Sequence, residues 1–190
     1  MGKNVAILAS GNGTNAETII RYFQEKGGED GVMLVVSNRQ NVNVFKRAEN
    51  LHVPCIYISK EKWTTGEEVL KLLADYRVDF IVLAGFLAKV PDALLHAYPQ
   101  RIINIHPSLL PKFGGKGMYG DRVHQAVVEA GERESGITIQ YINEHYDEEI
   151  LLPSSVVLFF QRIQQKMWRC GCMRWSTNII RRSSKDCWLR

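Results

Sequence analysis

The chain has 190 residues, of which 45% are hydrophobic and 23% are charged, and its formal net charge is +4. These proportions exclude a chain too polar to bury a sizeable core, and the length suits about one domain. No run of about 18 apolar residues occurs and the glycine-rich N-terminus does not resemble a signal peptide, so we predict a cytoplasmic protein without a membrane span.

Short apolar runs alternate with amphipathic segments along most of the chain. Runs of strand length occupy residues 5–9, 32–36, 55–58, 80–84 and 102–105. Segments with helical periodicity lie between them, at residues 16–26, 42–51, 67–76 and 93–98, and a further helix and strand are expected at 122–130 and 137–142. Strands that are apolar throughout and alternate with helices indicate a sheet covered on both faces. We therefore predict a doubly wound, mostly parallel α/β fold of the Rossmann-like kind.

The turn at residues 10–15 follows the first strand and opens the first helix. Backbone N–H groups at the start of a helix favour an anion. The turn fits the dinucleotide pattern G-x-G-x-x-G/A, but Ser37, Asn38 and Arg39 stand where an acid should hold the ribose. We therefore expect a simple phosphate group, with side-chain hydrogen bonds from Thr14 and Asn15. The alternative is a tight turn without a ligand.

The strand at residues 102–105 ends in an amide and an imidazole. Asn104 and His106 are two residues apart, so in an extended chain their side chains point the same way. An amide can donate to a developing oxyanion, and an imidazole can carry a proton near neutral pH. The pair predicts an acyl-transfer site, although His106 could instead be a buried structural histidine. Asp147 could orient the imidazole or be a solvated loop acid.

Three segments resemble the folate-dependent formyltransferases. They are residues 8–15 (LASGNGTN), 82–86 (VLAGF) and 104–111 (NIHPSLLP), supported by residues 136–138 and Asp147. The likeness spans residue 3 to about residue 148. The third segment is typical of the whole family, and the first points to the branch that acts on glycinamide ribonucleotide.

That resemblance implies roles for particular residues. The catalytic residues would be Asn104, His106 and Asp147. The phosphate of the substrate would bind Gly13, Thr14, Asn15, Ala16 and Glu17. The folate would bind Lys62, Phe86, Leu87, Ala88, Lys89, Val90 and Asn104, together with a loop formed by Asn143, Glu144, His145, Tyr146 and Asp147.

The implied reaction transfers a formyl group from 10-formyltetrahydrofolate, the co-substrate, to the amine of glycinamide ribonucleotide in purine biosynthesis. Asn104 and a protonated His106 would stabilise the oxyanion, and Asp147 would keep His106 charged. No metal is expected. The partners would be small molecules, with no nucleic acid or membrane, and the protein would be a monomer or weak homodimer. The alternatives are a formyltetrahydrofolate hydrolase and an inactive, truncated paralogue that binds nucleotide without turnover.

The composition changes at about residue 150. Residues 1–150 hold 16 basic and 19 acidic residues, a net charge of −3, whereas residues 151–190 hold 8 basic residues and one acid, a net charge of +7. Three of the four cysteines and three of the four tryptophans lie in this last part. We predict a formyltransferase domain at 1–149 and an atypical basic tail at 150–190. The hypothesis for the tail is a shift of reading frame near codon 148.

Overall fold

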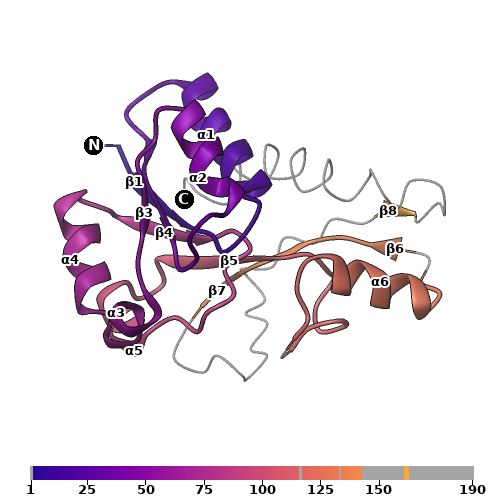
Figure 1. The fold of residues 1–190 in the computed structure, drawn as a ribbon. Coiled ribbons are helices and arrows are strands. Elements are labelled where there is room, and N and C mark those ends of the chain that lie inside the picture. Colours follow the sequence, from indigo (N-terminus) through magenta and orange to yellow (C-terminus); the bar gives the residue numbers. More distant parts are fainter. Residues whose placement is uncertain (1, 116, 133, 143–160, 163–190) are drawn as a thin grey trace. The chain divides into compact units, whose positions relative to one another are not determined.

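The computed structural model describes residues 2–115, 117–132, 134–142 and 161–162 (Figure 1). Its contacts divide the chain into two units. The first unit comprises Met1–Asn104 and Tyr141–Glu144, and the second comprises Ile105–Gln140 and His145–Arg190.

A six-stranded sheet with the order β3-β2-β1-β4-β5-β7 forms the centre of the fold. β1 pairs in parallel with both β2 and β4, and the pairs β2–β3 and β4–β5 are parallel as well. This order and direction confirm the predicted doubly wound, mostly parallel fold. The strands are β1 (Asn4–Leu8), β2 (Gly31–Ser37), β3 (Cys55–Tyr57), β4 (Phe80–Leu83), β5 (Ile102–His106) and β7 (Thr138–Tyr141).

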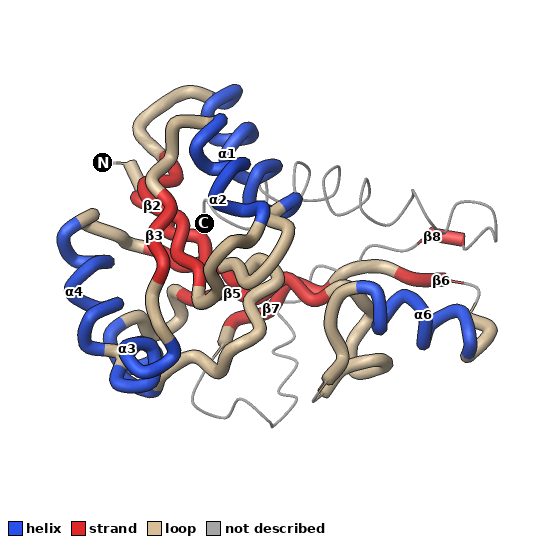
Figure 2. The backbone as a smooth tube through the Cα atoms, viewed as in Figure 1, coloured by secondary structure: helices blue, strands red, loops and turns tan. Residues whose placement is uncertain are grey.

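Helices cover both faces of the sheet in the first unit. α1 and α2 lie together on one face, and α3, α4 and α5 gather on the other (Figures 1 and 2). Four of these helices were predicted, whereas α3 was not. Ser59 caps α3 by accepting a hydrogen bond from the Lys62 N–H, and Gly66, with φ of 75°, separates α3 from α4. The helices are α1 (Thr14–Lys26), α2 (Asn43–Asn50), α3 (Lys60–Thr65), α4 (Glu67–Asp75) and α5 (Asp92–Ala97).

Alternate residues of β1 divide between the two faces of the sheet. Ala6 and Leu8 join a buried cluster that includes Trp63 of α3 and Leu73 of α4. Val5 and Ile7, which alternate with them on β1, are also buried and point to the opposite face. Burial on both faces explains why β1 is apolar throughout, without the polar alternation of a half-exposed strand.

The second unit contains α6 (Asp121–Glu129), within one residue of the predicted helix, and a short antiparallel pair. Val123 and Val127 are buried on one side of α6. β6 (Glu134–Ser135) pairs with β8 (Gln161–Arg162), and neither two-residue strand was predicted. Over the described ranges, no helix combines the length and apolar character that a membrane span requires.

Candidate active site

The strand register brings the predicted site segments to one edge of the sheet. Leu8, the last residue of β1, pairs with Leu83, the last residue of β4. Leu83 in turn pairs with Asn104 on β5. The loop that follows β1, the loop that follows β4 and the side chain of Asn104 therefore start from three neighbouring strands at their carboxyl ends. Ligands of doubly wound sheets bind at this edge.

Ser10 joins the loop after β1 to the loop after β4. Its N–H donates to the Gly85 carbonyl at 3.1 Å, and its hydroxyl accepts from the Leu87 N–H at 2.8 Å. The same hydroxyl donates to Asn38 Oδ1 at 2.6 Å, at the end of β2. Ser10 is 1% exposed. These bonds fix the predicted phosphate turn beside the predicted folate segment, and sequence analysis did not assign Ser10 a role.

Gly13 allows α2 to approach the turn closely. Its φ is 75°, in the left-handed region that glycine adopts without strain. A Cβ at this position would lie 2.5 Å from Val44 Cγ2, and the Val44 N–H donates to the Gly11 carbonyl at 3.3 Å. Both the backbone conformation and the space therefore require glycine at residue 13.

The first turn of α1 presents backbone N–H groups at the turn. No side chain caps this helix at Gly13, and the first three N–H groups of a helix have no acceptor inside it. The Glu17 N–H, by contrast, is used inside the helix, where it donates to the Gly13 carbonyl at 2.9 Å. Asn15 Oδ1 is buried and has no hydrogen-bond partner within the described part of the chain. Thr14, Asn15 and Ala16 are thus placed as an anion site requires.

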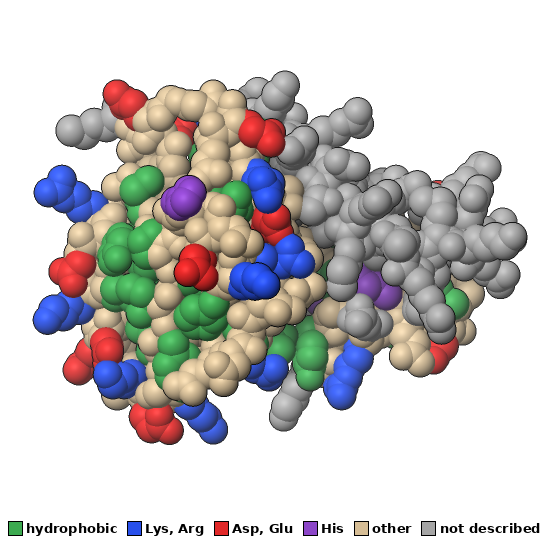
Figure 3. Space-filling model, turned by 45° about the horizontal axis from the view of Figure 1, so that its top comes forward, with side chains coloured by type: hydrophobic (Ala, Val, Ile, Leu, Met, Phe, Trp, Pro, Cys, Tyr) green, Lys and Arg blue, Asp and Glu red, His purple; other side chains and the backbone are tan. Residues whose placement is uncertain are grey.

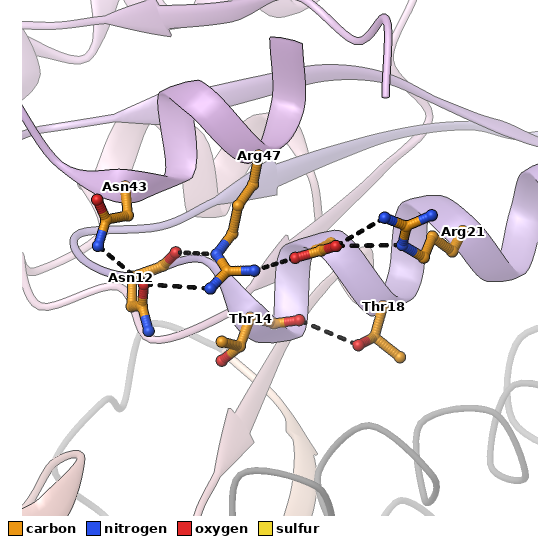
Figure 4. Close-up of polar contacts among 7 residues, drawn as sticks. Asn12, Thr14, Thr18, Arg21, Asn43 and Arg47 are labelled. Carbon is orange, nitrogen blue, oxygen red and sulfur yellow. Dashed lines mark hydrogen bonds and ion pairs between the residues drawn. The ribbon is translucent and has the colours of Figure 1, made fainter. Parts of the chain in front are cut away.

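Arg47 of α2 reaches across to the turn and to α1 (Figure 4). Its Nε donates to the Asn12 carbonyl at 2.9 Å, and its guanidinium also pairs with the Glu17 carboxylate. Arg21 pairs with the same carboxylate at 2.9 Å, and Asn43 Nδ2 donates to Asn12 Oδ1 at 3.1 Å. Arg47 is separated from Asn12 by 35 positions, so sequence spacing gave no sign of this contact.

The charges around Glu17 favour an anion at the start of α1. Burial alone would raise the pKa of the Glu17 carboxyl, but hydrogen bonds and charge from Arg21 and Arg47 outweigh it and lower that pKa. Two guanidinium groups therefore surround one carboxylate. Both arginines bind the Glu17 side chain. The contribution of Glu17 to phosphate binding stays a prediction.

The predicted folate segment at 86–90 packs against α3. Trp63 Nε1 donates to the Lys89 carbonyl at 2.8 Å, and the ring centroids of Trp63 and Phe86 are 4.7 Å apart. Val90 is fully buried and anchors the segment in the core, whereas Leu87 is 38% exposed. The partly buried Ala88 packs against the same cluster as Phe86.

Lys62 lies on the exposed side of α3, where it pairs with Glu68 at 2.8 Å. Its side chain is 58% exposed. Folate binding by Lys62 stays a prediction, and it would require the ammonium group to exchange a solvated ion pair for a ligand carboxylate.

Asn104 and His106 alternate with buried residues on β5. Both are partly buried, whereas Ile103 and Ile105 are buried, in agreement with the expected placement of the amide and the imidazole on the same side. Asn104 and His106 are thus the polar residues on the less buried side of β5.

The His106 ring is held by a backbone carbonyl. Its Nε2 lies 3.0 Å from the Phe113 oxygen, and burial lowers the His106 pKa while this hydrogen bond raises it by less. The net direction is downward, so the described surroundings favour the neutral ring at neutral pH. Asp147, which was expected to keep His106 charged, lies outside the described residues.

Two buried hydroxyl groups hold the segment that follows His106. Ser108 Oγ donates to the Lys112 carbonyl at 2.9 Å, and Thr138 Oγ1 donates to the Ser108 carbonyl at 2.7 Å. Thr138 Oγ1 also accepts from the Leu110 N–H at 3.1 Å. Both Ser108 and Thr138 are fully buried. Sequence analysis used these residues only as part of a motif.

Several predicted residues lie outside the part of the chain that the structure describes. They are the folate loop at Asn143, Glu144, His145, Tyr146 and Asp147, and most of the predicted tail at 150–190. Among the described residues, no three His, Cys, Asp or Glu side chains gather as a metal would require. On the face drawn in Figure 3, Lys and Arg side chains are interspersed with Asp and Glu, and no single sign of charge dominates.

Comparisons with known proteins agree on one family. The sequence model of the formyl transferase family matches residues 3–164, which runs past the predicted domain boundary at residue 149. Phosphoribosylglycinamide formyltransferase of Bacillus subtilis is 36% identical over 149 residues, which cover 76% of this chain and 74% of that protein. The chloroplastic enzyme of the same name from Arabidopsis thaliana is 39% identical over 160 residues.

The matched length differs between relatives. The alignment with the Arabidopsis protein covers 82% of this chain but 55% of that protein, so the chain spans about half its length. The crystal structure of glycinamide ribonucleotide transformylase 1 from Symbiobacterium toebii aligns with a TM-score of 0.80 at 25% identity. That alignment covers 95% of this chain and 85% of the other.

Proposed function

This chain belongs to the formyl transferase family, and we propose that it transfers a formyl group from 10-formyltetrahydrofolate to the amine of glycinamide ribonucleotide, a step of purine biosynthesis. The observation that carries the proposal is the register of Leu8, Leu83 and Asn104 at one edge of the sheet. It supports the proposal because the turn after β1, the segment at 86–90 and the Asn104 amide start from neighbouring strands. The names of the relatives in Bacillus and Arabidopsis support the choice of acceptor.

The phosphate of the ribonucleotide would bind at the start of α1. Thr14, Asn15 and Ala16 offer backbone N–H groups, and the Nδ2 group of Asn15 would be the side-chain donor to the anion. Arg47 holds the preceding turn and adds positive charge. A phosphate monoester is a dianion, so its negative charge would be attracted to the helix start and to Arg47.

The folate would lie against the segment at 86–90. Trp63 and Ser10 hold the backbone of this segment from two sides, through Lys89 and Leu87 respectively. A rigid backbone can offer its N–H and C=O groups to the polar edge of a pterin. The proposed folate contacts of the loop at 143–147 come from the resemblance.

The chemistry would move one proton from the attacking amine to the folate nitrogen. The amine nitrogen bonds to the formyl carbon, and the Asn104 amide donates to the resulting oxyanion. Neutral His106 accepts the proton that the amine loses, and as an imidazolium it then stabilises the oxyanion and protonates the departing nitrogen N10. Asp147 would support the charged form of the ring in this step. The bond from the carbon to N10 breaks as the formamide forms, with no metal in the scheme.

Mixing the full chain with formyl-folate and glycinamide ribonucleotide tests the proposal. Deformylation of the folate that depends on the ribonucleotide supports it. Deformylation without the ribonucleotide would instead indicate the hydrolase, and the absence of any deformylation would indicate the inactive paralogue. Either of the last two results contradicts the proposal.

We propose a monomer or weak homodimer with small-molecule substrates and a cytoplasmic location, although two plant relatives carry "chloroplastic" in their names. We also propose that residues 1–149 hold the formyltransferase domain and that the frame shifted near codon 148. Translation of the coding DNA in the other two frames after that codon tests the shift, since one frame should restore an acidic, helical ending.

A further inference from the structure

The nitrogen that carries the proton on neutral His106 follows from its hydrogen bond. A carbonyl oxygen only accepts hydrogen bonds, so the contact of 3.0 Å between Nε2 and the Phe113 oxygen requires a proton on Nε2. The neutral ring then has its lone pair on Nδ1. Nδ1 is therefore the nitrogen that can accept a proton while the Phe113 contact is intact.

The carbonyl of Phe113 is itself held in place by Ser108. The Ser108 hydroxyl lies 2.9 Å from the Lys112 oxygen and 3.4 Å from the Phe113 oxygen, so its single proton is shared between two successive carbonyl groups. Phe113 has a φ of 57°, a conformation that side-chain-bearing residues seldom adopt. Such a conformation persists where surrounding contacts determine it, and the shared hydroxyl is one of those contacts.

Thr138 secures the same segment from β7. Its hydroxyl donates to the Ser108 carbonyl and accepts from the Leu110 N–H. Because Ser108 and Thr138 are both fully buried, water cannot replace either hydroxyl without rearrangement of the segment. Hydrogen bonds thus connect the buried Thr138 and Ser108 to the Phe113 carbonyl that contacts the imidazole.

We propose that Ser108, supported by Thr138, is a positioning residue that holds the Phe113 carbonyl against Nε2 of His106 and so presents Nδ1 as the proton acceptor. The proposal deepens the proposed function, on which its catalytic meaning rests. The tautomer itself is a property of the free protein and can be measured without any substrate.

Nitrogen-15 NMR of the ring tests the proposal directly. The full chain is labelled on histidine and observed at a pH of about 8, where an ordinary histidine is neutral. His106→Gln identifies the signals of this ring by their loss. We expect a protonated, pyrrole-type Nε2 and an unprotonated, pyridine-type Nδ1. A proton found mainly on Nδ1 would overturn the proposal, whether or not the protein transfers a formyl group.

Variants then separate positioning from simple stability. Ser108→Ala should raise the share of the Nδ1–H tautomer and lower kcat on the order of 10- to 100-fold, with a smaller change in KM, because the ring is misplaced. Thr138→Val should act in the same direction, and Thr138→Ser, which keeps the hydroxyl, should restore much of the loss. Ser135→Ala removes a hydroxyl from β6 and serves as the control.

The outcomes distinguish this proposal from the proposed function. If Ser108→Ala keeps the wild-type tautomer, the positioning role is wrong, even if kcat falls. If the tautomer shifts as expected but neither wild type nor variants transfer a formyl group, the positioning role stands and the proposed function fails. If Ser108→Ala does not fold, Thr138→Val and Thr138→Ser supply the same comparison.

Discussion

Gly13 lies so close to Val44 that a Cβ on residue 13 would approach the valine Cγ2 to 2.5 Å. The glycine belongs to the turn after β1, and the valine belongs to α2. The turn and α2 are therefore fitted to each other at a point where no other amino acid has room. The position of α2 matters for the site because Arg47 extends from the same helix.

Replacement of Gly13 by alanine should destabilise the protein by about 1–3 kcal/mol, because it adds overpacking to backbone strain. Gly131→Ala is the control, since Gly131 also has a positive φ, of 67°, but open space where its Cβ would be. Urea denaturation of both variants measures the difference. Equal losses of stability would show that α2 yields easily to the added methyl group.

Removal of the Asn104 amide should affect the reaction far more than the fold. Asn104→Ala removes one oxyanion donor, which typically lowers kcat about 100- to 1,000-fold. Steady-state kinetics with both substrates measures the effect, and the circular dichroism spectrum and midpoint of unfolding show whether the fold is intact. A variant with most of its rate would refute the role assigned to the amide.

Loss of the Arg47 guanidinium should weaken binding of the ribonucleotide. Arg47→Ala frees the Asn12 carbonyl and reduces the positive charge near α1, so we expect KM for glycinamide ribonucleotide to rise about tenfold, which corresponds to about 1.4 kcal/mol. KM for the formyl-folate should change little. Arg21→Ala is the control, because Arg21 binds the same carboxylate from within α1.

Deletion of the Ser10 hydroxyl should, in contrast, affect both substrates. Ser10→Ala leaves the Leu87 N–H and the Asn38 side chain without their partner, at a cost of about 1–3 kcal/mol in stability. Because Ser10 joins the two loops, we expect KM to rise for ribonucleotide and folate together. Thr64→Ala, which removes an exposed hydroxyl from α3, is the control for a generic loss. An increase confined to one substrate would contradict the joint role.

Glu17 should make stability depend on pH in the acidic range. Its pKa is lowered below the ordinary value of 4.5 in the folded protein, so the carboxylate stabilises the fold fully above about pH 4.5. That contribution is lost as the pH falls through the lowered pKa of the folded state. Glu17→Gln should therefore be less stable than wild type at pH 7, and the two should converge as the pH falls from 7 through that lowered pKa. A constant difference between them across this range would rule out the ion pairs as its cause.

The layered fold and the alternation of Asn104 and His106 with buried residues on β5 could be predicted from the sequence. Continuous apolar runs such as residues 5–9 predict strands buried on both faces, and the observed β1 is buried in that way. The two-residue spacing on β5 carries the amide and the imidazole to one side of the strand. Both results follow from local periodicity, which the chain displays wherever the rest of it lies.

The tertiary structure alone decided which polar groups support the site. Ser10 and Leu87 are 77 positions apart, Asn12 and Arg47 are 35 apart, and Ser108 and Thr138 are 30 apart. No period links such pairs, because their contacts arise only when distant segments of the chain come together in the folded sheet and its loops. Each of these hydrogen bonds depends on the closure of a long stretch of chain, and for that physical reason Arg47, Ser10 and the support of His106 could not be predicted from the sequence.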